Sequence, residues 1–401
     1  MAVGKVNDVA GASIGKVQGV AAASIGKLSD VAASLGEEEQ YTRLAMVVGE
    51  SAEVYWTTSS TINSMEDWTL LDLGSGGYDS VKWGHDSDGN EVWIIARDSA
   101  SDPMYIAVSD GSTNWVPSAS ANWVSVRPDG GRQLDGKGHR VSYGNTGSDD
   151  QATWMLASVG ESEYAYYVSG SITDPSNWEV VFRGFDGSSQ EGSFRPMLWN
   201  REEDDEKSTF LIGVNNPGEL WASANGTGSG DNNDWMEVDG GFSGNSKNKG
   251  AAAYSQGKWV VLGQQSAEHH RIGEGFPPTT WADLNEPAAN RQMLSIATDM
   301  TGTMIAVGKN SYVWRSFDNG DNWEEIRVTG SNAGVYRTWR GIAYDNNMLN
   351  EDGGGTWLVA GSGGDFMVST DNGENWHPFS ISDSTNRQYN AVAFNCTGAY
   401  Q

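Results

Sequence analysis

Two stretches decide the fold: S-F-D-N-G-D-N-W at residues 316–323 and S-T-D-N-G-E-N-W at residues 369–376. Asp and Asn side chains can hydrogen-bond to the backbone of their own turn, and Gly accepts the positive φ of a tight turn. A Trp after the turn supplies a large apolar surface. We therefore expect a hairpin between the outer strands of a small sheet, with the Trp packed into the next sheet. The structural residues are Asp318, Gly320, Trp323, Asp371, Gly373 and Trp376.

Five decayed copies of this pattern lie upstream. They end in Trp and span residues 63–68, 109–115, 173–178, 231–235 and 278–281. With the two clear copies they give seven Trp anchors, at positions 68, 115, 178, 235, 281, 323 and 376. Their spacing lies around the roughly 40–50 residues that a four-stranded propeller blade occupies. The count predicts seven blades.

A second repeat marks the innermost strand of each blade. The nine-residue stretches that start at Arg291, Arg337 and Arg387 align without gaps, and weaker copies begin at Lys137, Gly192, Lys247 and Asp79. Their small and apolar residues, followed by a second short apolar run, are typical of buried neighbouring strands.

The last copy of this strand predicts how the ring closes. No blade follows the stretch at Arg387, whereas the first blade begins at residues 44–49 with no innermost strand before it. If the last strand completes the first blade, no open sheet edge remains. We expect an all-β protein: a seven-bladed β-propeller of four-stranded blades over residues 37–401, closed by its C-terminal strand.

The S-x-D-N-G-x-N-W pattern resembles the Asp-box of sialidase-like and BNR-repeat propellers, over residues 41–401. Such propellers include sialidases, glycan-binding proteins, photosystem-assembly factors of the Ycf48 type and virion proteins. Because one fold hosts all of these activities, the resemblance implies the architecture and leaves the function open.

Composition excludes several classes of partner. The chain has 53 acidic and 25 basic residues, a net charge of −28, which disfavours nucleic acid and anionic membrane surfaces. The single cysteine, Cys396, excludes an internal disulfide framework, and its strand-like surroundings predict a buried thiol. No apolar stretch approaches the roughly 20 residues of a membrane span. Lysines interrupt the N-terminal stretch, which is unlike a secretion signal, so we expect folding in a cytoplasm.

Residues 1–36 follow a different pattern, with an 11-residue period. Apolar residues at a spacing of three are separated by Gly, Ala and Ser, which suits a segment that lies closely against a partner chain. Its glycines disfavour a lone helix, and a disordered leader is the alternative. The anchoring residues are Val3, Val6, Val9, Ile14, Val17, Val20, Ile25, Leu28 and Val31.

This segment resembles the I-G-K-V-x-G-V-A leaders of tailed-phage virion proteins, especially those of marine phages. The resemblance implies that residues 1–36 attach a displayed domain to a capsid or tail protein, with residues 36–40 as a solvated spacer. It also implies a location in the virion, after synthesis in the host cytoplasm.

The sequence lacks the residues of a sialidase active site. That family needs three arginines, a tyrosine nucleophile paired with a glutamate, and an aspartate. Phe194-Arg195-Pro196 is the one echo of its arginine motif, and seven blades depart from the six of the family. His269 and His270 are expected to be a solvated pair, and residues 86–91 a polar hairpin tip rather than a calcium loop. We expect no catalytic residues, no metal and no cofactor.

Basic residues recur at two equivalent positions of the innermost strand. The first position holds Lys137, Lys247, Arg291, Arg337 and Arg387, and the second, three residues on, holds Arg140, Arg195 and Arg340. Equivalent positions form a ring around a propeller's channel, where cations would bind an anionic ligand, a carboxylated glycan or an acidic partner loop. In the alternative interpretation each arginine pairs with a local Asp or carbonyl and holds the blades together.

The sequence favours a non-enzymatic phage virion protein whose leader docks on the particle and whose propeller is displayed outside, for decoration or host-surface adhesion. A sialidase-like propeller that binds or hydrolyses glycans is one alternative. An assembly factor resembling the Ycf48 group is another. The propeller pattern demands no particular oligomeric state.

Overall fold

The computed structural model describes residues 16–17, 20–21, 43–51, 53–59, 62–99, 103–112, 115–128, 139–146, 151–158, 164–168, 170–183, 194–201, 208–214, 220–223, 235–238, 249–263, 270–275, 277–287, 291–331, 334–345, 355–381 and 387–395. The chain divides into two units, Met1–Thr42 and Arg43–Gln401. None of the helical turns among these residues is long and apolar enough to cross a membrane.

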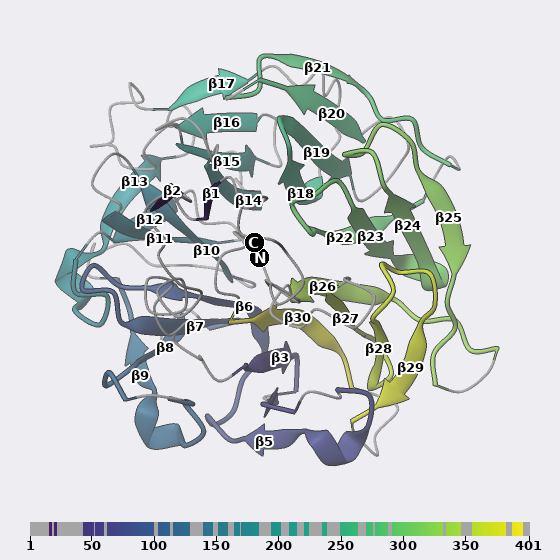
Figure 1. Ribbon diagram of the computed structural model, residues 1–401. Helices are drawn as coiled ribbons and strands as arrows, with labels where there is room; N and C mark the ends of the chain where they lie inside the picture. Colours follow the sequence, from purple (N-terminus) through teal and green to yellow (C-terminus); the bar gives the residue numbers. More distant parts are fainter. Residues whose placement is uncertain are drawn as a thin grey trace. The chain divides into compact units, whose positions relative to one another are not determined.

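The second unit is a β-propeller of seven four-stranded antiparallel sheets, as predicted. The strands β6, β10, β14, β18, β22, β26 and β30 lie innermost around the centre, and the fourth strands lie at the rim (Figure 1).

We number the blades from 1 to 7 and give the strands from the centre outward. Blade 1 is β30 (Tyr389–Phe394), β3 (Ala45–Gly49), β4 (Val54–Thr57) and β5 (Thr69–Leu71). Blade 2 is β6 (Tyr78–His85), β7 (Glu91–Arg97), β8 (Met104–Val108) and β9 (Val124–Val126). Blade 3 is β10 (His139–Thr146), β11 (Gln151–Ser158), β12 (Tyr164–Val168) and β13 (Glu179–Arg183). Blade 4 is β14 (Phe194–Arg201), β15 (Ser208–Val214), β16 (Leu220–Ser223) and β17 (Met236–Val238).

The remaining blades have the same order. Blade 5 is β18 (Lys249–Ser255), β19 (Lys258–Gly263), β20 (Arg271–Glu274) and β21 (Thr280–Asp283). Blade 6 is β22 (Met293–Thr298), β23 (Met304–Gly308), β24 (Tyr312–Ser316) and β25 (Glu324–Arg327). Blade 7 is β26 (Trp339–Asp345), β27 (Thr356–Gly361), β28 (Asp365–Ser369) and β29 (His377–Ser380).

The C-terminal strand closes the ring, which confirms the prediction. β30 pairs antiparallel with β3, from Ala45 opposite Phe394 to Gly49 opposite Tyr389. Arg43, just before β3, forms an ion pair with the buried Asp345 at the end of β26. Blade 1 is therefore closed by its own sheet, and a buried charge pair joins it to blade 7.

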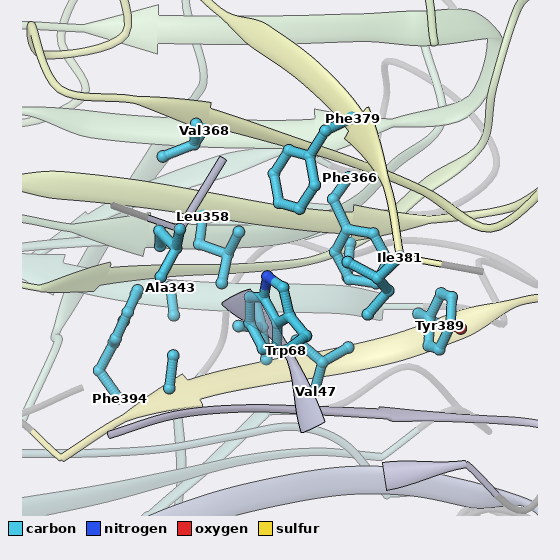
Figure 2. Close-up of a cluster of buried hydrophobic side chains, with 14 residues drawn as sticks. Val47, Trp68, Ala343, Leu358, Phe366, Val368, Phe379, Ile381, Tyr389 and Phe394 are labelled. Atoms are coloured by element: carbon cyan, nitrogen blue, oxygen red, sulfur yellow. The ribbon is translucent and has the colours of Figure 1, made fainter. Parts of the chain in front are cut away.

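The apolar core is divided among the blade interfaces. Each hydrophobic cluster of described residues joins the sheets of two neighbouring blades. Between blades 7 and 1, Trp68 lies beside Leu358 and Phe366 (Figure 2). The Trp68 and Phe366 rings stack with centroids 6.1 Å apart. Since each sheet is covered on both faces, its strands are apolar along nearly their whole length.

The two S-x-D-N-G-x-N-W hairpins join the third and fourth strands of blades 6 and 7, as predicted. In blade 6 the Asp318 carboxylate accepts hydrogen bonds from the Ser316 hydroxyl and the Asn322 backbone N–H, both at 2.9 Å. Gly320 has φ +89°. Trp323 packs with Val260 of blade 5, the neighbouring sheet. The copy in blade 7 repeats these contacts around Asp371.

Blades 1 to 3 bring a Trp to the same place through a different turn. Three 3-10 turns, η4 (Met65–Asp67), η5 (Ser120–Asn122) and η6 (Pro175–Asn177), end directly before Trp68, Trp123 and Trp178. The expected anchor of blade 2 was Trp115, which is wrong. Trp115 is buried, but its S-D-G turn lies well before β9, and Trp123 directly precedes that strand.

In the first unit, β1 (Lys16–Val17) and β2 (Val20–Ala21) form a two-stranded antiparallel sheet. Val17 and Val20 of the predicted anchoring set pair with each other there. The other seven anchoring residues lie outside the described residues, as does Cys396.

Candidate functional site

The structure places the predicted cationic positions at equivalent points of the blades. Arg291, Arg337 and Arg387 each lie two residues before an innermost strand, β22, β26 and β30. The second set, Arg140, Arg195 and Arg340, are second residues of β10, β14 and β26. Lys137 and Lys247 lie outside the described residues.

Arg337 is engaged within its own blade. Its Nε pairs with the carboxylate of Asp365, the first residue of β28, whose side chain is 1% exposed. Asp365 also accepts a hydrogen bond from the Ser331 hydroxyl. The Arg337 backbone N–H donates to the Ser311 hydroxyl at 2.8 Å, which ties blade 7 to blade 6. A buried ion pair of this kind fixes geometry, and breaking one partner leaves an uncompensated charge.

Arg387 and Arg291 are also paired. Arg387 pairs with Glu53, just before β4, and Glu53 accepts a further hydrogen bond from the Tyr389 hydroxyl at 3.1 Å. Arg291 forms a two-pronged contact with Glu325 of β25, at 2.9 and 3.3 Å. The three described members of the first set therefore each have a carboxylate partner in their own blade, as the structural interpretation expects. Ligand binding by this set stays a prediction.

The Glu325 carboxylate has a perturbed pKa. Burial acts to raise the pKa of Glu325, but hydrogen bonds from Arg291 and from the Trp314 indole, with the charges of Arg291 and Arg327, lower it overall. Glu325 therefore stays ionised to a lower pH than a free glutamate.

Blade 2 has an equivalent guanidinium that sequence reasoning missed. Gly76 occupies the position two residues before β6, and the arginine comes instead from Arg97, the last residue of β7. Arg97 donates to the Ser75 carbonyl and stacks on Tyr105 at 4.8 Å. A Cβ added to Gly76 would lie 2.8 Å from the Arg97 guanidinium. The repeat was aligned on the innermost strand, so an arginine at the end of the second strand, such as Arg97, gave no signal in it.

Two members of the second set, Arg340 and Arg195, lie at bulges of innermost strands, whereas Arg140 is paired with Ala157. Register shifts in β26, β30 and β6 leave Arg340, Asn390 and Asp79 between paired residues, and bulges re-aim side chains. Arg340 donates to the Gln388 side chain, and Asn390 donates to the Tyr78 carbonyl at 3.0 Å. These contacts join blade 7 to blade 1 and blade 1 to blade 2.

Arg140 makes a similar contact between blade 3 and blade 2. Its guanidinium donates to the Asp79 backbone carbonyl of blade 2. Burial lowers the pKa of Arg140, the charge of Asp79 acts to raise it, and the charge of Arg340 acts to lower it. Arg340 in turn lies 3.8 Å from the Glu50 carboxylate. Arg140 and Arg340 lie within electrostatic range of each other, and acidic side chains lie beside them. A cationic ring that binds a ligand stays a prediction.

The remaining sequence candidates have structural explanations where they are described. His270 was expected to be solvated, which is wrong: its side chain is buried, and its Nδ1 accepts from the Gly263 N–H at 3.1 Å. Residues 86–91 form the predicted polar hairpin tip, with Asp86 accepting from the Asp88 and Asn90 N–H groups at 2.9 Å. Within the described ranges, no group of three His, Cys, Asp or Glu side chains could hold a metal ion.

Comparison with known proteins supports the fold alone. No protein-family model and no curated protein matches the chain. Virginiamycin B lyase from Staphylococcus aureus superposes with a TM-score of 0.52 at 9% identity, covering 77% of this chain and 85% of the lyase. Raptor from Chaetomium thermophilum gives 0.49 at 12% identity, covering 85% of this chain but only 26% of Raptor. YCF48 from Cyanidioschyzon merolae gives 0.47 at 10% identity, covering 79% of this chain and 94% of YCF48.

Proposed function

We propose that this chain is a non-enzymatic binding protein of a phage particle. In this proposal residues 1–36 dock on a capsid or tail protein, and the propeller, of the Asp-box type, is displayed outside for decoration or host-surface adhesion. The observation that carries the proposal is that a repetitive segment, residues 1–36, comes before a propeller whose ring is already closed.

The closed ring supports this proposal. Its twenty-eight strands lie between Ala45 and Phe394, and the two described strands of the first unit pair only with each other. Because no described strand before residue 43 enters a blade, the 11-residue repeat is free to serve another role. Apolar residues at regular spacing among small ones suit close packing on a partner chain.

The arginine contacts favour binding over catalysis. The arginines described at the entries to the innermost strands have acidic partners inside their blades. A substrate carboxylate would have to displace such a partner, and at Arg337 that means breaking a pair with a buried carboxylate. We therefore propose a rigid scaffold that presents its surface to a partner, rather than a hydrolase with an arginine-lined active site.

Sedimentation of purified particles tests the leader. We expect the full chain to co-sediment with particles of the encoding phage and a version lacking residues 1–36 to stay at the top of the gradient. A sharper variant replaces Val6, Val17 and Leu28, which share one position of the repeat, with Asn. Its matched control replaces the following residues, Asn7, Gln18 and Ser29, with Ala.

Mass spectrometry of the gradient fractions reads the outcome. Loss of incorporation in the Asn variant, with retention in the Ala variant, supports docking through the apolar face. If the full chain itself is absent from particles, the virion role is wrong. Co-purification with particle precursors but not with finished particles would favour the assembly-factor alternative.

A further inference from the structure

Blade 6 carries a stack of alternating arginine and tyrosine side chains. Arg291 lies over the Tyr312 ring at 4.0 Å, and Arg327 lies over the same ring at 4.5 Å. Arg327 also lies over the Tyr336 ring at 4.5 Å and donates to its hydroxyl at 3.2 Å. Each such contact is an electrostatic attraction between the cation and the face of the ring. Together they hold two tyrosine rings at fixed positions.

The backbone beneath the stack is strained and braced. Asn310 and Ser311, directly before Tyr312, have φ of +58° and +64°. The corresponding turn of blade 7 has Gly363 and Gly364, with φ of +76° and +75°. A residue with a side chain is strained in this conformation, and strain of this kind concentrates at functional sites.

Ser311 holds this turn to the neighbouring loop. Its N–H donates to the Arg337 carbonyl at 2.7 Å, and its own carbonyl accepts from Val328 at 3.0 Å. The Ser311 hydroxyl accepts from the Arg337 N–H. Val328 and Arg337, which lie on either side of Tyr336 in the sequence, are therefore both hydrogen-bonded to the turn that precedes Tyr312. A surface fixed in this way loses little conformational entropy when it binds.

The stack is open to solvent and locally positive. Tyr336 is 56% exposed and the neighbouring Val335 is 40% exposed. Lys309, Asn310 and Arg327 are exposed as well. Lys309, Arg291 and Arg327 carry three positive charges, against the one negative charge of Glu325 that pairs with Arg291. Residues 328–337 contain no acidic residue, on a chain whose net charge is −28.

We propose that this surface, formed by Tyr312, Arg327 and Tyr336 with Lys309 and Asn310, binds an anionic saccharide. The sugar ring packs on the exposed face of Tyr336, since an aromatic face attracts the weakly positive C–H groups of a sugar. Its carboxylate or sulfate pairs with Arg327 and Lys309. The exposed Asn310 amide supplies a donor and an acceptor for a ring hydroxyl.

An acidic peptide or a nucleic acid fits these features less well. An acidic peptide would use the positive charges but not the exposed ring face. A nucleic acid would use both but would be repelled by the acidic remainder of the molecule. This inference names a ligand class for the proposed adhesion role. It rests on that proposed function only in assuming that the saccharide belongs to a host surface.

Calorimetry on the free full-length chain tests the proposal, so its outcome does not depend on incorporation into particles. The probes are carboxylated and sulfated oligosaccharides, among them oligogalacturonate. The methyl ester of oligogalacturonate and a poly-aspartate peptide serve as controls. We expect the carboxylated sugar to bind. The methyl ester should lose about tenfold or more in affinity, because it keeps the ring but not the charge.

Variants on the same blade locate the site. Tyr336→Ala and Arg327→Gln should each weaken binding about tenfold, whereas Tyr336→Phe should retain the ring-stacking part. Phe317 provides the matched control, since it is 54% exposed and lies under the Arg315 guanidinium at 4.6 Å in the hairpin between β24 and β25. Phe317→Ala should leave binding unchanged. Binding of none of the saccharides, equal binding of poly-aspartate, or an unaffected Tyr336→Ala protein would overturn the proposal.

Discussion

Blades 7 and 2 place a guanidinium at the start of the innermost strand by different routes. In blade 7 it comes from Arg337, and Gly361 ends the second strand opposite Trp339. In blade 2, Gly76 takes the place of Arg337, and Arg97 ends the second strand opposite Tyr78. Relative to blade 7, the glycine and the arginine of blade 2 occupy each other's positions.

The partners differ accordingly. Arg337 pairs with a buried carboxylate, whereas Arg97 stacks on the rings of Tyr78 and Tyr105. Burial raises the pKa of Tyr78 to about 12, so its hydroxyl stays neutral at ordinary pH. The comparison teaches that, in these two blades, the guanidinium near the start of the innermost strand can come from either of two segments of the chain.

The largest effect is expected at the buried pair of blade 7. Asp365→Asn keeps the shape of the side chain but leaves Arg337 without its counter-charge. We expect a loss of about 3–5 kcal/mol in the free energy of unfolding. Urea denaturation measures it.

Glu324→Gln is the control for this change, because Glu324 pairs with Arg315 while its side chain is 48% exposed. It should cost no more than about 1 kcal/mol. Equal, small losses in both variants would mean that Asp365 does not stabilise the fold through its charge.

A smaller effect is expected at the exchanged glycine of blade 2. Gly76 has φ +133°, and a Cβ there would press on the Arg97 guanidinium, whereas Gly74, with φ +94°, has nothing within 4 Å of such a Cβ. Both Ala variants bear the cost of a positive φ. Gly76→Ala should cost about 1–3 kcal/mol more, from overpacking.

Combining Gly76→Ala with Arg97→Ala should recover part of that excess, since the clash disappears with the guanidinium. Unfolding free energies of the four proteins in this cycle measure the coupling. Strict additivity would show that Gly76 and Arg97 do not share the space that the exchange implies.

The smallest effect is a pH dependence in blade 6. Because the folded-state pKa of Glu325 is lowered, its charge stabilises the fold above the unfolded pKa of about 4.3. This contribution is lost as the pH falls through the lower folded-state pKa. The difference in unfolding free energy between the parent protein and Glu325→Gln should be constant above about pH 5.5 and shrink below pH 4. A difference independent of pH would contradict the role of the Arg291 pair.

The sequence by itself determined the architecture. The D-N-G turns around Asp318 and Asp371 are closed by hydrogen bonds within a few residues, so they can be predicted from the local sequence alone. The copy of the innermost strand at Arg387 with no blade after it was enough to predict that β30 closes blade 1. Seven blades and their strand order followed from these local signals.

Only the tertiary structure decided which side chains contact one another. Trp115 and Trp123 both lie in turn-like sequence, and only the pairing of β9 shows which of them stands at the anchor position. His270 is polar by sequence but buried beneath Trp314 of the next blade. The Arg–Tyr stack draws on separate segments of blade 6 and the loop after it. Ion pairs and ring contacts depend on which segments become neighbours in space, whereas a turn depends on the residues beside it in the chain.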